Sequence, residues 1–411
     1  MNKIKLGKIA YYSDTRIDLS NLTEKNYVGT DNLLQNKKGK VDSEYLRKKG
    51  KVTEYKENDI LIANIRPYLR KIWRAKGKGG SSADVLTIRV GDSEFYPNFI
   101  YYNLFQDTFF DWVMKGAKGS KMPRGDKNQI MEFQIPKFDY LTQKKIVSVL
   151  SVIDDKIELN HKINTELEQL ARQIYEYWFL QFDFPDENSN PYKSSGGKMV
   201  LNKILKSEIP VGWQVRKLGE VSEIRNGGTP STTDKSNYGG NISWATPNDL
   251  SVSGEKFFFK GQRNISEKGA KSLGGIPIPK DSILLTSRAP IGLIAINKTE
   301  TYTNQGFKNI VPNSEMISVE YLFYCLSKGI KNLINLGGGT TFKEISKSVL
   351  EEYTIIVPES SQLCEFNVHV EPIFKKIQQN IKENKSLLDL RDFLLPMLMN
   401  GQINVDNIQV N

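Results

Sequence analysis

A heptad pattern that occurs twice constrains the fold of this chain more than any other feature of its sequence. One copy covers residues 142–180 and the other covers residues 362–400. In both copies, apolar side chains recur at alternating spacings of three and four residues, which is typical of a helix that packs along a partner helix. The ten corresponding positions are Ile146/Phe366, Leu150/Val370, Ile153/Ile373, Ile157/Ile377, Asn160/Asn380, Asn164/Asn384, Leu167/Leu387, Ala171/Arg391, Ile174/Leu394 and Trp178/Leu398.

Two shared asparagines show that the copies are related. Asn160 and Asn164 correspond to Asn380 and Asn384. Either helix alone would be interpreted as an ordinary amphipathic helix buried against its own domain. Independent core helices, however, have no physical reason to place amides at the same two heptad positions. We therefore predict a two-helix coiled coil within one chain, in which the asparagine layers disfavour any register that sets them against apolar side chains.

The composition is that of a globular protein with more than one domain. The 411 residues are 39% hydrophobic and 25% charged, and the chain is too long for a single core. The sequence has no signal-peptide pattern and no apolar run near 18 residues, so we expect a cytoplasmic location and no membrane. Cys325 and Cys364 have no partner spacing, and we expect both to be reduced and structural. The two histidines, His161 and His369, lie within the helical repeats, which argues against metal or histidine catalysis.

The duplication extends to the segment before each helix. In residues 1–140 we predict strands within 59–73, 84–90 and 132–138, and an aromatic-rich helix over 99–116. The same order recurs in residues 208–360, with different loops. The Pro, Gly, Ser and Asn content of 182–198 indicates a linker. The expected domains are a first lobe at 1–140, a helix at 141–181, a linker at 182–207, a second lobe at 208–360, and a helix with a tail at 361–411.

The charge points to a polyanionic partner, whereas catalytic motifs are absent from the sequence. The net charge is +10, and the basic excess is larger in residues 1–140 than in 208–360. We find no phosphate-binding loop, no dinucleotide-binding turn and no pair of metal ligands. The string ATPND at 245–249 lacks the second proline and the aromatic residue that an amino-methyltransferase site would need. We therefore expect no catalytic residue, no metal and no cofactor.

Polar and basic residues on glycine-bearing loops are the candidate recognition groups. Such side chains can contact phosphates or base edges, with Asn or Gln paired to adenine and Arg paired to guanine. Each string alone is also typical of an ordinary turn. In the first lobe the candidates are Arg66, Lys71, Lys118, Ser120, Lys121 and Arg124. In the second lobe they are Thr229, Asn248, Ser287, Arg288, Asn304, Gln305, Lys308, Thr340 and Thr341.

Several longer strings resemble the specificity subunits of type I restriction-modification enzymes. They are IPVGWQVRKLGEV (209–221), GGTP (227–230), ISWATPNDL (242–250), ILLTSRAPIG (283–292), TNQGFKNIVP (303–312), PYKSSGGKMV (191–200) and LLDLRDFLLPMLMNGQI (387–403). The resemblance covers essentially the whole chain. It implies an α/β (α+β) architecture with two similar target-recognition lobes, separated by an intramolecular antiparallel two-helix coiled coil in a pseudo-two-fold tandem repeat. In that arrangement Asn160 should face Asn384, and Asn164 should face Asn380.

The resemblance also implies partners. Each lobe would read one half of a split site in double-stranded DNA, and the helices would set the spacer and dock two modification (methyltransferase) subunits. Restriction subunits would join through these. We expect Tyr175, Phe179, Leu395 and Met399 to form the docking surface. Two other interpretations remain open, a stand-alone DNA methyltransferase and a structural scaffold without sequence preference.

Overall fold

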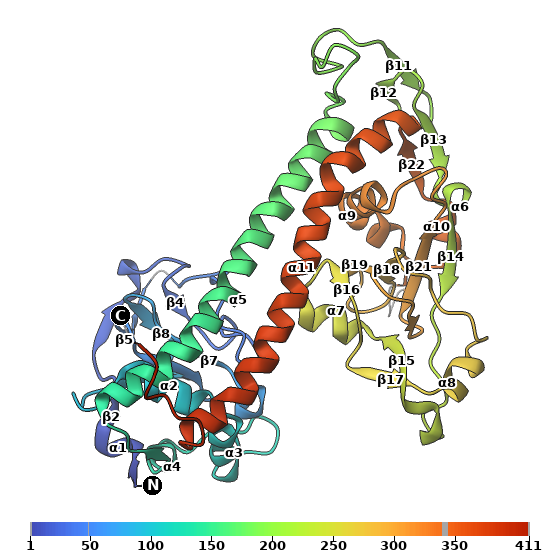
Figure 1. Ribbon diagram of the computed structural model, residues 1–411. Helices are drawn as coiled ribbons and strands as arrows, with labels where there is room; N and C mark the ends of the chain where they lie inside the picture. Colours follow the sequence, from blue (N-terminus) through green and yellow to red (C-terminus); the bar gives the residue numbers. More distant parts are fainter. Residues whose placement is uncertain (1, 48, 339–343, 410–411) are drawn as a thin grey trace. The chain divides into compact units, whose positions relative to one another are not determined.

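The computed structural model describes residues 2–47, 49–338 and 344–409, which form two compact units. The first unit comprises residues 1–160 and 382–411, and the second comprises residues 161–381. Both long helices predicted from the heptads are present. Helix α5 covers Tyr140–Tyr175 and continues as a π-helical turn over Glu176–Leu180, and helix α11 covers Ser360–Met399 (Figure 1). Each unit contains one part of α5 and one part of α11.

The first unit combines two four-stranded sheets with short helices. Its strands are β1 (Lys3–Lys5), β2 (Ala10–Tyr12), β3 (Arg16–Asp18), β4 (Tyr27–Val28), β5 (Lys51–Tyr55), β6 (Ile60–Ala63), β7 (Ile72–Arg74), β8 (Gly79–Ser81), β9 (Val85–Val90) and β10 (Gln134–Pro136). Its short helices are α1 (Leu6–Ile9), η1 (Leu19–Asn21), η2 (Pro67–Leu69), α2 (Pro97–Phe105), α3 (Asp107–Lys115) and α4 (Lys127–Met131). The sheet orders are β2-β9-β6-β7 and β3-β5-β8-β4, and β1 pairs with β10.

The second unit repeats this order with longer insertions. Its strands are β11 (Met199–Asn202), β12 (Ser207–Pro210), β13 (Gln214–Lys217), β14 (Ser222–Asn226), β15 (Tyr238–Ala245), β16 (Phe257–Phe258), β17 (Arg263–Ile265), β18 (Ile283–Thr286), β19 (Ile294–Asn297), β20 (Tyr302–Thr303), β21 (Phe307–Pro312) and β22 (Thr354–Val357). Its short helices are α6 (Leu218–Val221), η4 (Lys235–Asn237), α7 (Pro247–Ser253), α8 (Glu267–Ser272), α9 (Val319–Leu336) and α10 (Lys347–Glu351). The main sheet has the order β14-β21-β18-β19-β16.

The asparagine layers confirm the antiparallel register. In the first unit, Asn160 Nδ2 donates to Asn384 Oδ1 at 2.8 Å. In the second unit, Asn380 Nδ2 donates to Asn164 Oδ1, also at 2.8 Å. A parallel pair would have placed Asn160 beside Asn380. Because all four amides are buried, these hydrogen bonds are what make the polar layers tolerable inside an apolar seam.

Two local predictions differ from the structure. The helix predicted over 99–116 is two helices, α2 and α3, because Gln106 between them is extended (φ −67°, ψ 149°). The predicted linker is also more ordered than its composition indicates. Strands β11 and β12 form a hairpin there, and Phe184 is buried between the rings of Tyr192 and Trp213. Aromatic residues within this polar segment supply the packing that its overall composition obscures.

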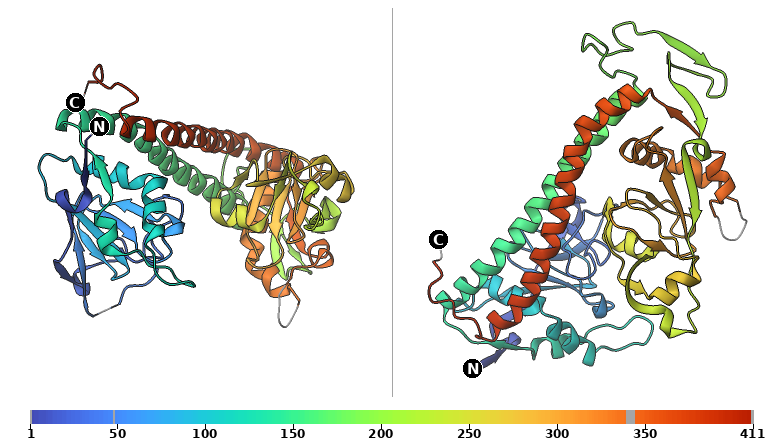
Figure 2. Two further views of the ribbon diagram at one scale, coloured as in Figure 1. Left: turned by 90° about the horizontal axis from the view of Figure 1, so that it is seen from below. Right: turned by 45° about the vertical axis from the view of Figure 1, so that its right-hand side comes forward.

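The C-terminal tail of the first unit packs on the start of α5. The ammonium of Lys145 donates to the carbonyl of Asp406 at 2.6 Å, and Val405 is buried in the apolar core of this unit. Figure 2 shows the tail beside the first turns of α5. The tail therefore covers the end of the lobe to which it belongs.

Candidate nucleic-acid interface

A basic loop between α3 and α4 is the main candidate surface of the first unit. Lys118 and Arg124 exchange two backbone hydrogen bonds of 2.9 Å, which close the loop into a hairpin-like turn. The amide of Arg66 donates to the carbonyl of Pro123 at 2.7 Å and brings a second arginine to the same place. Arg66, Lys118 and Arg124 are exposed, as are Ser120 and Lys121. Five predicted recognition residues of this lobe are thus brought together.

Lys71 does not belong to this surface. Its ammonium donates to the carbonyl of Thr30 at 2.6 Å, and burial lowers its pKa. This donor holds a loop of its own lobe, so Lys71 lies apart from the exposed basic loop, and its contact with DNA stays a prediction.

Polar loops of the second unit also converge. The amide of Gly228 donates to the carbonyl of Thr303 at 2.8 Å, and the amide of Asn304 donates to the carbonyl of Ala245 at 2.9 Å. These bonds join the loops that carry the candidates Thr229, Asn248 and Gln305. A Cβ atom on Gly227 would lie 1.9 Å from the carbonyl oxygen of Asn304, so the close approach requires glycine.

Within this cluster, Asn248 and Gln305 are exposed and Thr229 is half-buried. Asn304 is also half-buried, and its Oδ1 accepts a hydrogen bond from the amide of Gly306 at 2.9 Å. The side chains best placed to meet a base edge are therefore the amides of Asn248 and Gln305.

Two further candidates, Ser287 and Lys308, are buried. Ser287 is fully buried, and both its amide and its hydroxyl donate to the carbonyl of Gly306. Lys308 is buried and forms an ion pair with Glu344, with 3.2 Å between Nζ and Oε1. Both side chains face inward because they lie next to the central sheet, so they support the surface and do not form it. The predicted Thr340 and Thr341 lie outside the described residues.

Arg288 is the exposed cation of the second unit's cluster. Its Nε lies 3.0 Å from Glu344 Oε2, and about half of its side chain is accessible. Burial raises the pKa of Glu344, but hydrogen bonds from Lys308 and Arg288 more than compensate, so its pKa lies below the usual value. Glu344 is therefore ionised at neutral pH and holds the guanidinium of Arg288 in place. Sequence reasoning missed Glu344.

The predicted docking residues are buried in the cores of the two units. Tyr175 and Phe179 lie in the core of the second unit, where the Phe179 ring packs on Tyr321 with 4.7 Å between centroids. Leu395 and Met399 lie in the core of the first unit. These helix positions flank the heptad seam, and helices of the lobes cover that flank. The heptad pattern predicts only the contacts between the two long helices. It does not predict that the lobes pack against the neighbouring helix positions.

Other apolar side chains of the helix pair are exposed. In the first unit these include Val152 and Leu159 on α5 and Leu390 and Phe393 on α11. Phe393 is 63% exposed, which is unusual for a side chain of this size. Members of each pair are seven or three residues apart and so share one face of their helix. These four residues define the apolar helix patch.

In the second unit, a buried cation ties the lobe to the helix pair. The ammonium of Lys256 lies 2.6 Å from Glu168 Oε2 on α5 and 2.6 Å from the hydroxyl of Tyr324 on α9. It also lies 4.0 Å from the ring centroid of Phe374 on α11. Burial lowers the pKa of Lys256 to about 8, although Glu168 opposes this change.

In the first unit, Arg391 has a comparable position. Its guanidinium lies 2.9 Å from Asp154 Oδ1 and 4.6 Å from the ring centroid of Phe105. The hydroxyl of Tyr102 donates to the other oxygen of Asp154 at 2.7 Å. Each lobe is thus attached through a tyrosine, a carboxylate on α5 and a buried cation. The one sequence signal was the charged Arg391 at an otherwise apolar seam position.

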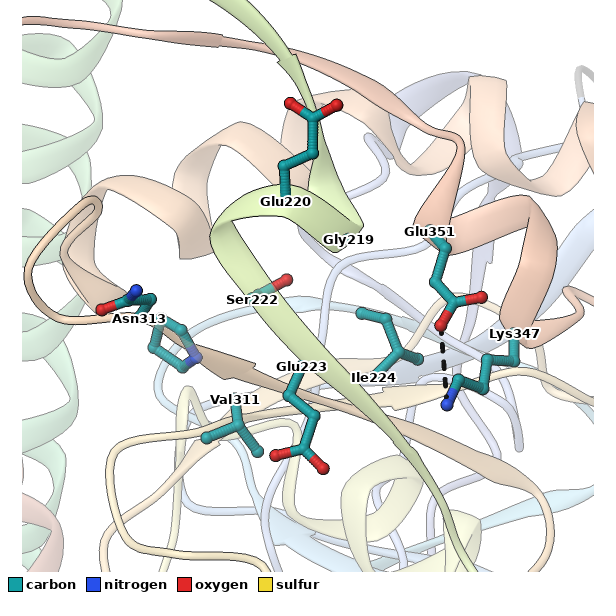
Figure 3. Close-up of a pocket in the computed structure, with 10 residues that line it drawn as sticks. Gly219, Glu220, Ser222, Glu223, Ile224, Val311, Asn313, Lys347 and Glu351 are labelled. Carbon is teal, nitrogen blue, oxygen red and sulfur yellow. Dashed lines mark ion pairs between the residues drawn. The ribbon is translucent and has the colours of Figure 1, made fainter.

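A pocket of about 470 Å³ in the second unit has the wrong charge for phosphates. It is lined by carboxylates of Glu220, Glu223 and Glu351 (Figure 3). Lys347 pairs with Glu351 at 3.5 Å. An acid-rich lining repels a nucleic-acid backbone, so this face is distinct from the candidate interface.

Among residues 2–47, 49–338 and 344–409, no group of three or more His, Cys, Asp or Glu side chains could hold a metal ion. Within the same residues, every helix is too short or too polar to cross a membrane.

The family model described as "Type I restriction modification DNA specificity domain" matches residues 1–169 and 210–384. The two matched segments cover most of the chain and follow its internal repeat. The chain therefore belongs to the family of type I restriction-modification specificity subunits.

Individual relatives agree with this assignment. The type I restriction enzyme MjaIX specificity subunit of Methanocaldococcus jannaschii is 39% identical over 184 residues, a match that covers 44% of this chain and only 42% of that protein. The HindI specificity subunit of Haemophilus influenzae is 26% identical over 406 residues, covering 85% of this chain and 87% of the relative. The crystal structure of the type I S subunit from M. genitalium has a TM-score of 0.58 at 17% identity, covering 97% of this chain and 95% of that one. The last comparison supports the fold.

Proposed function

We propose that this chain provides the DNA sequence specificity of a type I restriction-modification complex, with each unit reading one half of a split target. The observation that carries the proposal is the repeat itself. Two units with one order of elements present different polar loops, a basic loop with Arg66 and Arg124 in the first and an amide-rich cluster with Asn248 and Gln305 in the second. Equivalent scaffolds with different surface chemistry suit two different half-sites.

Methyl transfer and cleavage would then belong to the modification and restriction subunits. Under this proposal the isolated chain binds double-stranded DNA but not S-adenosylmethionine. A stand-alone methyltransferase would bind the cofactor by itself, and a plain scaffold would bind DNA without sequence preference. Isothermal titration of the isolated chain with S-adenosylmethionine, and competition between DNA duplexes, separate these three functions.

Mapping of methylated sites tests the split target. The complex reconstituted with its modification subunits is expected to mark a bipartite, asymmetric sequence. Exchange of residues 1–140 for the corresponding lobe of a relative is expected to change one half-site and to leave the other half and the spacer unchanged. A continuous target, or a change in both halves, would contradict the proposal.

The apolar helix patch is the proposed docking surface for a modification subunit. Exposed aromatic and aliphatic side chains on a soluble helix are typical of a protein interface. Leu390→Asp with Phe393→Asp is expected to reduce co-purification of the modification subunit at least tenfold, because two charges would be desolvated in the contact. The control is Leu388→Asp, which lies about 200° around the same helix from Leu390. Equal co-purification of both variants would exclude this surface.

A further inference from the structure

Four backbone hydrogen bonds define a chain crossing in the first unit, beside the basic loop. The amide of Asn64, directly after β6, donates to the carbonyl of Asp84 at 2.8 Å. The amide of Gly125 donates to the carbonyl of Asn64 at 3.1 Å. Immediately before Gly125, Arg124 is paired with Lys118 through two backbone bonds of 2.9 Å. The loop is thereby fixed against the segment that follows the central strand.

The second unit has the same crossing. The amide of Ser287, directly after β18, donates to the carbonyl of Gly306 at 2.7 Å, and the amide of Ile345 donates to the carbonyl of Ser287 at 3.0 Å. Glu344 is paired with Gly338 through two backbone bonds of 2.9 and 3.1 Å. When the backbone hydrogen bonds of the two crossings are matched one to one, Asp84 corresponds to Gly306, and Arg124 corresponds to Glu344.

At this shared position the charges of the two units are exchanged. In the first unit the arginine is on the loop, and Arg124 Nη2 lies 3.1 Å from Asp84 Oδ1. In the second unit the loop carries the carboxylate, and Glu344 binds Arg288 from the segment after β18. Gly306 has no side chain, so the second unit has no carboxylate equivalent to Asp84 at this position. Each crossing nevertheless presents one arginine that a carboxylate holds in place.

Both arginines are accessible although they are held. The side chain of Arg124 is 59% exposed and that of Arg288 is 52% exposed. A guanidinium that is already oriented loses less conformational freedom on binding, and its free N–H groups can contact O6 and N7 of guanine. A lysine at the same place would supply charge without the planar fork.

We propose that Arg124 and Arg288 are equivalent specificity-determining residues, each of which reads a guanine in the half-site of its own unit. Asp84 and Glu344 are the positioning residues that orient them. This inference rests on the proposed function, since it assigns one base contact to each half of the split target. The same crossing presents its arginine from the loop in the first unit and from the segment after β18 in the second unit.

Conservative variants in the reconstituted complex test the assignment. Arg124→Lys is expected to reduce discrimination at one G·C pair of one half-site by about tenfold to a hundredfold, as measured by methylation of a duplex panel with single substitutions. Arg288→Lys is expected to do the same in the other half-site only. Glu344→Gln should weaken discrimination at the same pair as Arg288→Lys, whereas Lys121→Ala should lower affinity uniformly for all duplexes.

The outcomes separate the two levels of inference. Suppose that the wild-type complex marks a split site, but that Arg124→Lys and Arg288→Lys lower affinity uniformly for all duplexes, as Lys121→Ala does. The two arginines would then contact phosphates, and the assignment to guanines would be overturned. The proposed function would still stand. If the wild-type complex marks no split site, both fail. Thermal unfolding of each variant shows whether a change in selectivity comes from a loss of folded protein.

Discussion

Replacement of Glu168 by glutamine is expected to lower the free energy of unfolding of the second unit by about 1.5 kcal/mol at pH 7, which is about the cost of removing the proton of Lys256 one pH unit below its pKa of about 8. The substitution keeps the shape of the side chain but removes the charge that faces Lys256 at 2.6 Å. A charged Lys256 would lie among the rings of Phe323, Tyr324 and Phe374 without a counter-ion, so its amine is expected to lose its proton in the folded variant. Cation–π contacts with these rings offset only part of the cost of burying a charge.

This loss should depend on pH. The pKa of Lys256 in the folded chain is about 8, below its ordinary value of 10.5, so a charged Lys256 costs folding free energy at pH 7. The cost decreases as the pH rises from 8 to 10.5, because the amine then becomes neutral in the unfolded chain as well. Urea unfolding at pH 7 and pH 9.5 is expected to show a smaller difference between Glu168→Gln and wild type at the higher pH. The control is Glu166→Gln, an exposed position on the same helix. An equal loss for Glu168→Gln at both pH values would contradict this account.

Replacement of Asp154 by asparagine is expected to cost the first unit about 3 kcal/mol or more, independently of pH between 7 and 9.5. Asp154 is the partner of Arg391, whose side chain is only 8% exposed. Burial lowers the pKa of Arg391, but Asp154 and Asp392 more than compensate, and its pKa lies above the usual value. The guanidinium of Arg391 stays protonated in this pH range, whereas the amine of Lys256 becomes neutral. The free-energy cost of the buried charge at Arg391 therefore does not decrease as the pH rises.

The same urea series measures this second prediction. Asp155→Asn, on the exposed side of α5, is the matched control and should change the free energy of unfolding by less than about 0.5 kcal/mol. Arg391 also pairs with Asp392 at 3.0 Å and keeps this partner in the variant. Recovery of the Asp154→Asn loss at pH 9.5 would show that titration of another group, and not the loss of the Arg391–Asp154 pair, causes it.

Heptad spacing and the shared residues predicted both long helices and the duplication, whereas their antiparallel register came from the family resemblance. Heptad spacing is a local, periodic property, and a buried amide needs a partner wherever it lies. Asn160 and Asn164 therefore predicted their contacts with Asn384 and Asn380, once an antiparallel pair was implied by the resemblance. The order of strands and loops in each lobe was equally visible, because strand patterns and turn residues are also local.

Packing between distant parts of the chain decides which side chains of these elements face outward. Tyr175 and Leu395 lie at helix positions that could be exposed or covered, and packing of the lobes covers them. Likewise, Ser287 and Arg288 are adjacent in the chain, yet one is fully buried and the other is held at the surface by Glu344. Burial of a side chain depends on residues distant in sequence, and so does the pairing of Arg124 with Asp84, which no local pattern encodes.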